Sequence, residues 1–251
     1  MLEDATLAAE DAQLARTDLC LADLDTAPAD GFVPWLKDRV RRHRAFKHPY
    51  YREFIRHEAS PADLRRYLVQ ESVVDGRFDD LLALLQLGTD GTTKLEIAEN
   101  YWDEMGNGDP ELVHTLMFSR ALDTLAISDV EMREEMSAEG LLSGNLAMLL
   151  SRYRETFPEA VGFLAVTEWL VPDRFSNVLA GWRRLGLDPA GIEYHDGHIA
   201  IDARHASGWF TNVVKPGTAS APFRRGVTRG ALWRLNSSAR YLDANLARAR
   251  R

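Results

Sequence analysis

Apolar residues recur along most of the chain at the three- and four-residue spacing of amphipathic helices, and no segment shows the alternation typical of a strand. Proline and serine mark helix starts at Pro34, Ser60-Pro61 and Pro158, and glycines mark several ends. A short helix is expected after Ser128. The longer predicted helices cover residues 34–47, 60–87, 92–105, 109–124, 138–156, 159–184, 190–213 and 221–248.

This pattern predicts an all-α bundle of about seven core helices. We expect one domain over residues 31–251, preceded by a polar helix or extension over residues 1–30. Pro172 lies inside the predicted helix 159–184, where it cannot donate a backbone hydrogen bond, so a kink is expected there.

Composition narrows the class of protein. Of 251 residues, 45% are hydrophobic and 27% are charged, which is typical of a soluble globular protein. The longest apolar runs are far too short to span a membrane, and the acidic N-terminus does not resemble a signal peptide, so a cytoplasmic protein is expected. The net charge of −8 argues against partners such as nucleic acid or anionic membrane. The single cysteine, Cys20, excludes a disulfide framework and thiolate metal sites, and we interpret it as inert packing.

The predicted helix 190–213 carries ionisable residues within its apolar face. His198, Asp202 and His205 fall within about 60° of one another on a helical wheel, among residues such as Tyr194 and Trp209. Burying these groups without partners would cost several kcal/mol, and a bound metal ion would compensate them. His195 lies near the same face but close to the helix start, and we interpret it as structural.

The same test finds further inward-facing groups on other helices. They are Glu71, Glu104, His114 and Glu168, each placed among apolar neighbours. Two alternatives remain open at this point: Asp75, one turn after Glu71, competes with it, and Glu111, three residues before His114, competes with Glu104. Carboxylates and imidazoles without thiolates favour iron or manganese over structural zinc. Four carboxylates would also balance the charge of two divalent cations.

A ferritin-like bundle would need two Glu-x-x-His pairs, and the chain offers one, at Glu111 and His114. The ligand pattern instead resembles that of the haem-oxygenase-like di-iron oxidases and oxygenases, an iron-containing redox enzyme family. Its last ligand helix carries His-x-x-x-Asp-x-x-His, which EYHDGHIAIDARH matches at His198, Asp202 and His205, and Glu168 lies thirty residues before His198 as in that family. The likeness extends over residues 60–210 or so.

The resemblance implies a haem-oxygenase-like bundle holding two Fe(II) ions, with O2 as co-substrate. The implied metal ligands are Glu71, Glu104, His114, Glu168, His198, Asp202 and His205. One iron would lie near Glu71, His114 and His198, and the other near Glu168, Asp202 and His205. No further catalytic residue and no organic cofactor are implied.

By this resemblance the substrate is a small molecule derived from an amino acid or amine, transformed by N-oxygenation or oxidative C–C or C–N chemistry in natural-product biosynthesis. The resemblance is compatible with an external electron donor and with a homodimer. Arg77, Arg152 and Arg174 are unranked candidates for binding a substrate carboxylate. Alternative functions are oxidation of a fatty acid at the same site and a metal-free, thiaminase-like or quinone-cofactor-synthase-like enzyme, while a non-enzymatic metal-storage protein would require features that the sequence does not show.

Overall fold

The computed structural model describes residues 2–14, 24 and 26–250, and in these residues every regular element is helical. The elements that build the site are α4 (Pro61–Glu71), α5 (Phe78–Leu85), α6 (Gly91–Glu104), α7 (His114–Thr124), α10 (Phe157–Arg184) and α11 (Glu193–Gly208). Around them lie α1 (Leu2–Leu14), α3 (Phe32–Arg42), α8 (Asp129–Glu135), α9 (Ala138–Arg152) and α12 (Ala221–Ala249). The predicted all-α bundle is confirmed for the described part of the chain.

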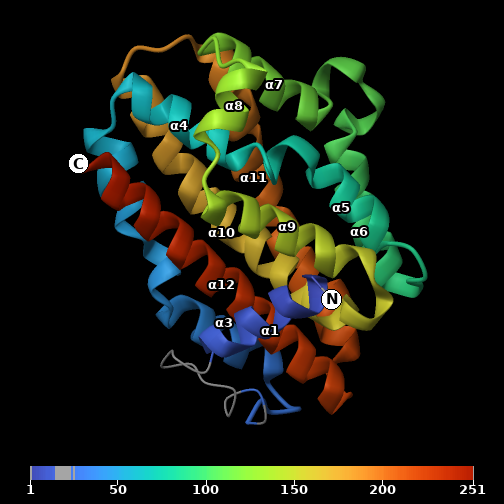
Figure 1. Cartoon of the computed structure of the whole chain (residues 1–251). Helices are drawn as coiled ribbons and strands as arrows, with labels where there is room; N and C mark the ends of the chain where they lie inside the picture. Colours follow the sequence, from blue (N-terminus) through green and yellow to red (C-terminus); the bar gives the residue numbers. More distant parts are fainter. Residues whose placement is uncertain (1, 15–23, 25, 251) are drawn as a thin grey trace.

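The centre of the bundle is α10, which packs along α12 on one side and along α11 on the other (Figure 1). Seventeen of its 28 residues are buried, so it has almost no face open to water. The helix continues through Pro172, and the hydroxyl of Ser176 donates to the carbonyl oxygen of Pro172. A helix buried on all sides is typical of the middle of a bundle, and it carries Glu168 into the interior.

The N-terminal helix α1 lies against α12 (Figure 1). Glu10 and Asp11 form ion pairs with Arg240 and Arg229 on α12. The remainder of the expected N-terminal helix, including Cys20, lies mostly outside the described residues, so the interpretation of Cys20 as inert packing stays a prediction.

Local sequence explains where several helices begin. Ser60 caps α4 in a reciprocal arrangement with Asp63, and Pro61 occupies the first turn. The side chains of Ser128, Ser137 and Ser220 accept from backbone N–H groups at the starts of α8, α9 and α12. These caps confirm the helix starts expected at Ser60 and Ser128.

One predicted helix is wrong: the expected helix 60–87 is divided in two. α4 ends at Glu71, and a short 3-10 turn over Asp75–Arg77 precedes α5. The hydroxyl of Ser72 donates to the carbonyl oxygen of Val69, and Arg77 has an extended φ of −159°. The break changes the helical phase after Glu71, and it turns Asp75 into the interior.

Other predicted helices also break at their ends: 34–47 and 138–156 each finish in a 3-10 turn, at Arg44–Lys47 and Arg154–Thr156. The expected helix 109–124 begins with a 3-10 turn at Pro110–Leu112, before α7. The expected helix 190–213 consists of a 3-10 turn at Pro189–Ile192, then α11, then a π-helical segment at Trp209–Val214. These irregular ends leave His198, Asp202 and His205 together on the regular helix α11.

Candidate metal centre

Two groups of three buried side chains face each other in the middle of the bundle. Each residue within a group offers one nitrogen or oxygen atom, and these atoms lie within 4.8 Å of one another. The first group is Glu104, His114 and His198, and the second is Glu168, Asp202 and His205. All six side chains are at least nine-tenths buried.

The first group is assembled by the turn between α6 and α7. Gly106 has a φ of 62°, and a Cβ atom there would lie 2.5 Å from the backbone of Leu112, so the turn requires glycine. This reversal brings His114, the first residue of α7, back beside Glu104, the last residue of α6. His114 Nδ1 lies 3.0 Å from Glu104 Oε2, and His198 Nε2 lies 3.7 Å from Glu104 Oε1.

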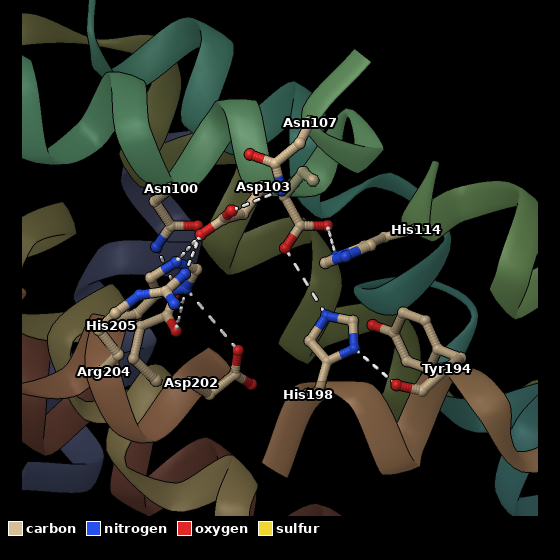
Figure 2. A network of polar contacts seen from close by, with 11 residues as sticks. Asn100, Asp103, Asn107, His114, Tyr194, His198, Asp202, Arg204 and His205 are labelled. Carbon is tan, nitrogen blue, oxygen red and sulfur yellow. Dashed lines mark hydrogen bonds and ion pairs between the residues drawn. The ribbon is translucent and has the colours of Figure 1, made fainter. Parts of the chain in front are cut away.

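Figure 2 shows the rings of His114 and His198 pointing toward one carboxylate. Their ring centroids are 4.3 Å apart. His198 Nδ1 lies 2.7 Å from the carbonyl oxygen of Tyr194, to which it can donate its proton. That donation leaves the lone pair of Nε2 facing the group, which is the form of histidine that binds a metal ion.

The second group joins α10 to α11. Asp202 and His205 lie one turn apart on α11, and Glu168 approaches from α10 with its Oε2 atom 3.6 Å from His205 Nδ1. The amide nitrogen of Asn100 donates to the other oxygen of Glu168 over 2.8 Å. His205 Nε2 lies 2.8 Å from Asp103 Oδ2, so His205 turns Nδ1 toward the two carboxylates.

His205 Nδ1 is buried and forms no hydrogen bond within the described part of the chain, although two carboxylates lie nearby. The same is true of His114 Nδ1, which approaches Glu104 without hydrogen-bond geometry. Buried nitrogen atoms that lack a hydrogen-bond partner and lie close to carboxylates are typical of a site for a cation. The residues present therefore suit a metal ion in each group.

The pKa values show how strongly the groups interact. Burial raises the pKa of Glu104, but the close approach and positive charge of His114 and His198 outweigh burial and hold that pKa at about 2. Burial lowers the pKa of His198, whereas Asp202 and Glu104 together raise it to about 10. Burial likewise lowers the pKa of His205, and Glu168, Asp103 and Asp202 raise it to about 9. Carboxylates that favour protonation of the neighbouring imidazoles this strongly would also attract a divalent cation in place of those protons.

A fourth carboxylate borders both groups. Asp75 is buried, and its Oδ2 atom forms no hydrogen bond with any described residue. Burial raises the pKa of Asp75 well above its usual range, and negative charge on Glu71 raises it further. Asp75 lines a small cavity of about 20 Å³ together with Glu104, His198, Glu168 and Asp202.

The structure brings together six of the seven residues that the sequence predicts as ligands. The seventh, Glu71, lies outside both groups and accepts hydrogen bonds at Oε1 from the hydroxyls of Tyr51 and Tyr241, over 3.3 and 2.7 Å. Asp75, the competing candidate, borders the groups instead. Of the other competing pair, Glu104 lies in the first group, whereas Glu111 is exposed and pairs with Arg120.

Sequence reasoning missed the residues that orient the histidines. Asp103 also pairs with Arg204 and accepts from Asn107, so it is itself held in place beside His205 (Figure 2). The one indication of this role in the sequence is that Asp103 directly precedes the predicted ligand Glu104. His195 is fully buried and contacts the hydroxyl of Tyr67 at 3.3 Å, away from both groups.

The comparisons with known proteins identify the family of the chain. A family model described as iron-containing redox enzyme matches residues 65–239. The chain therefore belongs to the family of iron-containing redox enzymes, and its fold is a haem-oxygenase-like bundle. No curated protein matches the sequence significantly.

Solved structures share the fold at low sequence identity. A TenA homologue from Pseudomonas syringae pv. tomato superimposes with a TM-score of 0.65 and 13% identity, covering 86% of this chain and 91% of that one. A TenA homologue from P. horikoshii gives a TM-score of 0.56 and 13% identity, covering 83% of this chain and 98% of that one. In the described residues, no helix is long and apolar enough to cross a membrane.

Proposed function

We propose that the protein is a non-haem di-iron enzyme that uses O2 to oxidise a small molecule. The observation that supports this best is the pair of buried carboxylate–imidazole groups on either side of one small cavity. In the proposed centre, Glu104, His114 and His198 hold one iron and Glu168, Asp202 and His205 hold the other. Asp75 replaces Glu71 as the remaining carboxylate.

Charge supports two divalent ions rather than one. Glu104, Glu168, Asp202 and Asp75 together contribute four negative charges when ionised, which two Fe(II) ions neutralise. Without cations, this number of carboxylates in a dry interior is unfavourable, as the raised pKa values of Asp75 and Asp202 show. Carboxylate and imidazole ligands without thiolate suit iron.

Two ferrous ions bound in this way supply the electrons and coordination positions for O2 activation. The chain supplies the surroundings. Phe78, Val171 and Phe175 line the apolar side of the cavity and keep water from its centre. Asn100 holds Glu168, Tyr194 holds His198 through its carbonyl oxygen, and Asp103 holds His205, so the ligands are oriented before any ion binds.

The proposal is tested by anaerobic titration with Fe(II), followed by mixing with O2. We expect about two irons per chain by metal analysis and a transient absorption band after O2 is added. His198→Gln and Asp202→Ala should each remove iron from one group while far-UV circular dichroism keeps its helical signal. His57→Gln, which changes an exposed histidine, is the matched control. A folded wild-type protein that binds no iron would contradict the proposal.

A metal-free enzyme similar to thiaminase-like or quinone-cofactor-synthase-like proteins is the second candidate, favoured by the likeness of the fold to TenA homologues. It would leave the buried carboxylates and imidazoles without a compensating cation. The same titration separates the two candidates, because the metal-free enzyme would be indifferent to Fe(II).

A further inference from the structure

A second cavity adjoins the candidate metal centre, and two buried arginines line it. Arg174 on α10 and Arg234 on α12 are at least nine-tenths buried. The cavity holds about 30 Å³ and shares Asp75, Thr167 and Phe175 with the cavity between the two ligand groups. A molecule in this cavity would therefore lie next to the proposed irons.

Neither arginine is neutralised by an acid. Within the described residues, the Arg174 guanidinium donates only to the carbonyl oxygen of Ala45 and the hydroxyl of Ser238, at 3.3 and 2.8 Å. Its Nε atom is buried without any hydrogen-bond partner. The Arg234 guanidinium donates through Nε to the hydroxyl of Thr167 over 2.7 Å, and no described carboxylate forms an ion pair with it.

These two cations also disfavour each other. Burial lowers the pKa of Arg234 to about 10, and the positive charge of Arg174 contributes to the lowering. With a pKa of about 10, Arg234 remains charged at neutral pH. Two buried guanidinium groups with unused donors are costly to the fold, and a bound anion would offset that cost. The planar array of N–H donors on arginine suits a carboxylate in particular.

An acidic residue, Glu71, lines the same cavity as the two arginines. Glu71 accepts from the hydroxyls of Tyr51 and Tyr241 at Oε1 only, so Oε2 forms no hydrogen bond within the described chain. Burial raises the pKa values of both tyrosines far above neutrality, so both remain hydrogen-bond donors. Glu71 is therefore oriented by these two hydrogen bonds, and its Oε2 atom is left for a cationic group on a ligand.

We propose that this cavity binds a compact α-amino acid, with its carboxylate on Arg174 and Arg234 and its ammonium group on Glu71. The proposal rests on the proposed function, because it names the substrate class of the same centre. Gln70, Ser143 and Thr167 add polar atoms to the lining. The lining therefore favours an amino acid over a fatty acid as substrate.

Of the three arginines proposed from the sequence for this role, the structure selects Arg174. Arg152 lies at the surface beside Glu3, and Arg77 is exposed. Arg234, which the sequence did not single out, completes the pair. It is found on α12, outside the predicted ligand helices.

The test measures binding to the metal-free protein, so that it does not depend on iron. The probes are the twenty proteinogenic L-amino acids, each compared with the amine that lacks its carboxylate and the acid that lacks its amino group, together with octanoate and dodecanoate. Binding is followed by equilibrium dialysis and by the shift in thermal unfolding temperature. We expect at least one amino acid to bind, and both of its truncated analogues to bind at least tenfold more weakly.

Variants then locate the binding site. Arg174→Met and Arg234→Met should each weaken binding of that amino acid at least tenfold. Glu71→Gln should weaken binding of the amino acid but not binding of the analogue that lacks its amino group. Arg152→Met, at a half-exposed arginine outside the cavity, should leave binding unchanged. Fatty acids that bind more tightly than every amino acid, or binding that is insensitive to both buried arginines, would overturn the proposal, as would a panel in which no amino acid binds.

Thermal unfolding of the same variants separates recognition from a purely structural role. If Arg234 exists to bind a ligand, Arg234→Met should unfold at the same temperature as wild type or a higher one. A marked decrease, together with unchanged ligand binding, would show that Arg234 is structural. Asp202→Ala completes the design, because it should lose iron while keeping amino-acid binding, so failure of the metal centre and failure of the binding site give different results.

Discussion

His198 and His205 share one design: each uses one ring nitrogen to contact the protein and turns the other toward a ligand group. For His198 the contact is the carbonyl oxygen of Tyr194, one turn earlier on α11. For His205 it is Asp103, a charged group that is itself held by Arg204 and Asn107. A carboxylate behind a histidine raises its basicity and fixes its orientation, so Asp103 should influence iron binding without touching iron.

The first prediction concerns Asp103. Asp103→Asn keeps the size of the side chain but removes its charge, so His205 becomes a weaker base and is held less firmly. We expect the affinity of the second group for Fe(II) to fall by roughly 10- to 100-fold, with the first group little changed. Anaerobic Fe(II) titration measures this. Asp196→Asn, at an exposed acid on the same helix as His205, is the control, and an equal effect in both variants would contradict the role of Asp103.

The second prediction concerns the pH dependence of stability through His195. Burial, together with the positive charge of His198, lowers the pKa of His195 to about 3, so the folded protein keeps this ring neutral. The unfolded chain binds a proton there below a pKa of about 6.5. Because the unfolded state binds more protons, stability falls as pH decreases from about 6.5 toward 3, by on the order of 2 kcal/mol at pH 5 from this group.

His195→Gln should remove this contribution, while keeping a polar atom near the hydroxyl of Tyr67. Urea unfolding at pH 7 and pH 5 measures it: the loss of stability between the two values should be smaller in His195→Gln than in wild type. His57→Gln changes an exposed histidine and should keep the wild-type loss. Equal losses in all three proteins would show that His195 titrates normally.

At the scale of elements, the seam between α10 and α12 depends on glycines. A Cβ atom at Gly162 would lie 1.9 Å from the carbonyl oxygen of Val227, and one at Gly230 would lie 1.8 Å from the carbonyl oxygen of Glu159. The two helices therefore approach backbone to backbone at two points. This contact fixes the position of Glu168 on α10 relative to Arg234 on α12.

The third prediction follows from that close approach. Gly162→Ala and Gly230→Ala should each destabilise the protein by about 1–3 kcal/mol or more, because the backbones must separate to admit a methyl group. Gly197→Ala is the matched control, since a Cβ atom there would meet nothing within 4 Å. On an open helical position, alanine should be neutral or stabilising by up to about 1 kcal/mol. Urea unfolding of the three variants measures the difference, and equal stabilities would contradict the tight seam.

The break between α4 and α5 shows which elements the sequence can predict. Helix starts at Ser60 and Ser128 were predictable, because a cap is a local interaction between residues three apart. The interruption after Glu71 contains no proline, and Gly76 alone did not indicate it. It depends on packing against other helices, including Gly144 of α9, where a Cβ atom would lie 2.8 Å from Val73.

The difference between local interactions and tertiary packing also decides which residues of the site could be predicted. His198, Asp202 and His205 lie on one regular helix, so helical periodicity alone places them on one face. The position of Asp75 could not be predicted, because it depends on the interrupted helix. Glu104 and His114 required the tertiary turn at Gly106. Arg234 and Asp103 carried no motif, and only the packing of α12 and α6 against the centre shows their surroundings.

At the scale of the whole molecule, the groups that allow the candidate centre to bind cations lower the stability of the metal-free protein. Asp75 is buried without a hydrogen bond at Oδ2, and burial and Glu71 raise its pKa well above the usual range. The sign follows from linkage: the folded state holds this proton more tightly than the unfolded state, so the stability of the metal-free protein decreases as pH rises above about 3.8 toward the raised folded pKa. At neutral pH, the metal-free fold would be more stable without this carboxyl group.

The last prediction is that Asp75→Asn raises the stability of the metal-free protein at pH 7 while weakening its response to iron. Asparagine fills the same space without a group that must be protonated, so the unfolding temperature of the metal-free variant should exceed that of the metal-free wild type. In wild type, Fe(II) at 100 times its dissociation constant should stabilise the fold by about 2.7 kcal/mol per site, and Asp75→Asn should lose part of that gain. Thermal unfolding under anaerobic conditions, with and without Fe(II), measures both effects. Glu71→Gln provides the comparison: if its gain from Fe(II) falls while that of Asp75→Asn is retained, the ligand is Glu71, as the sequence first indicated, and Asp75 has only a structural role.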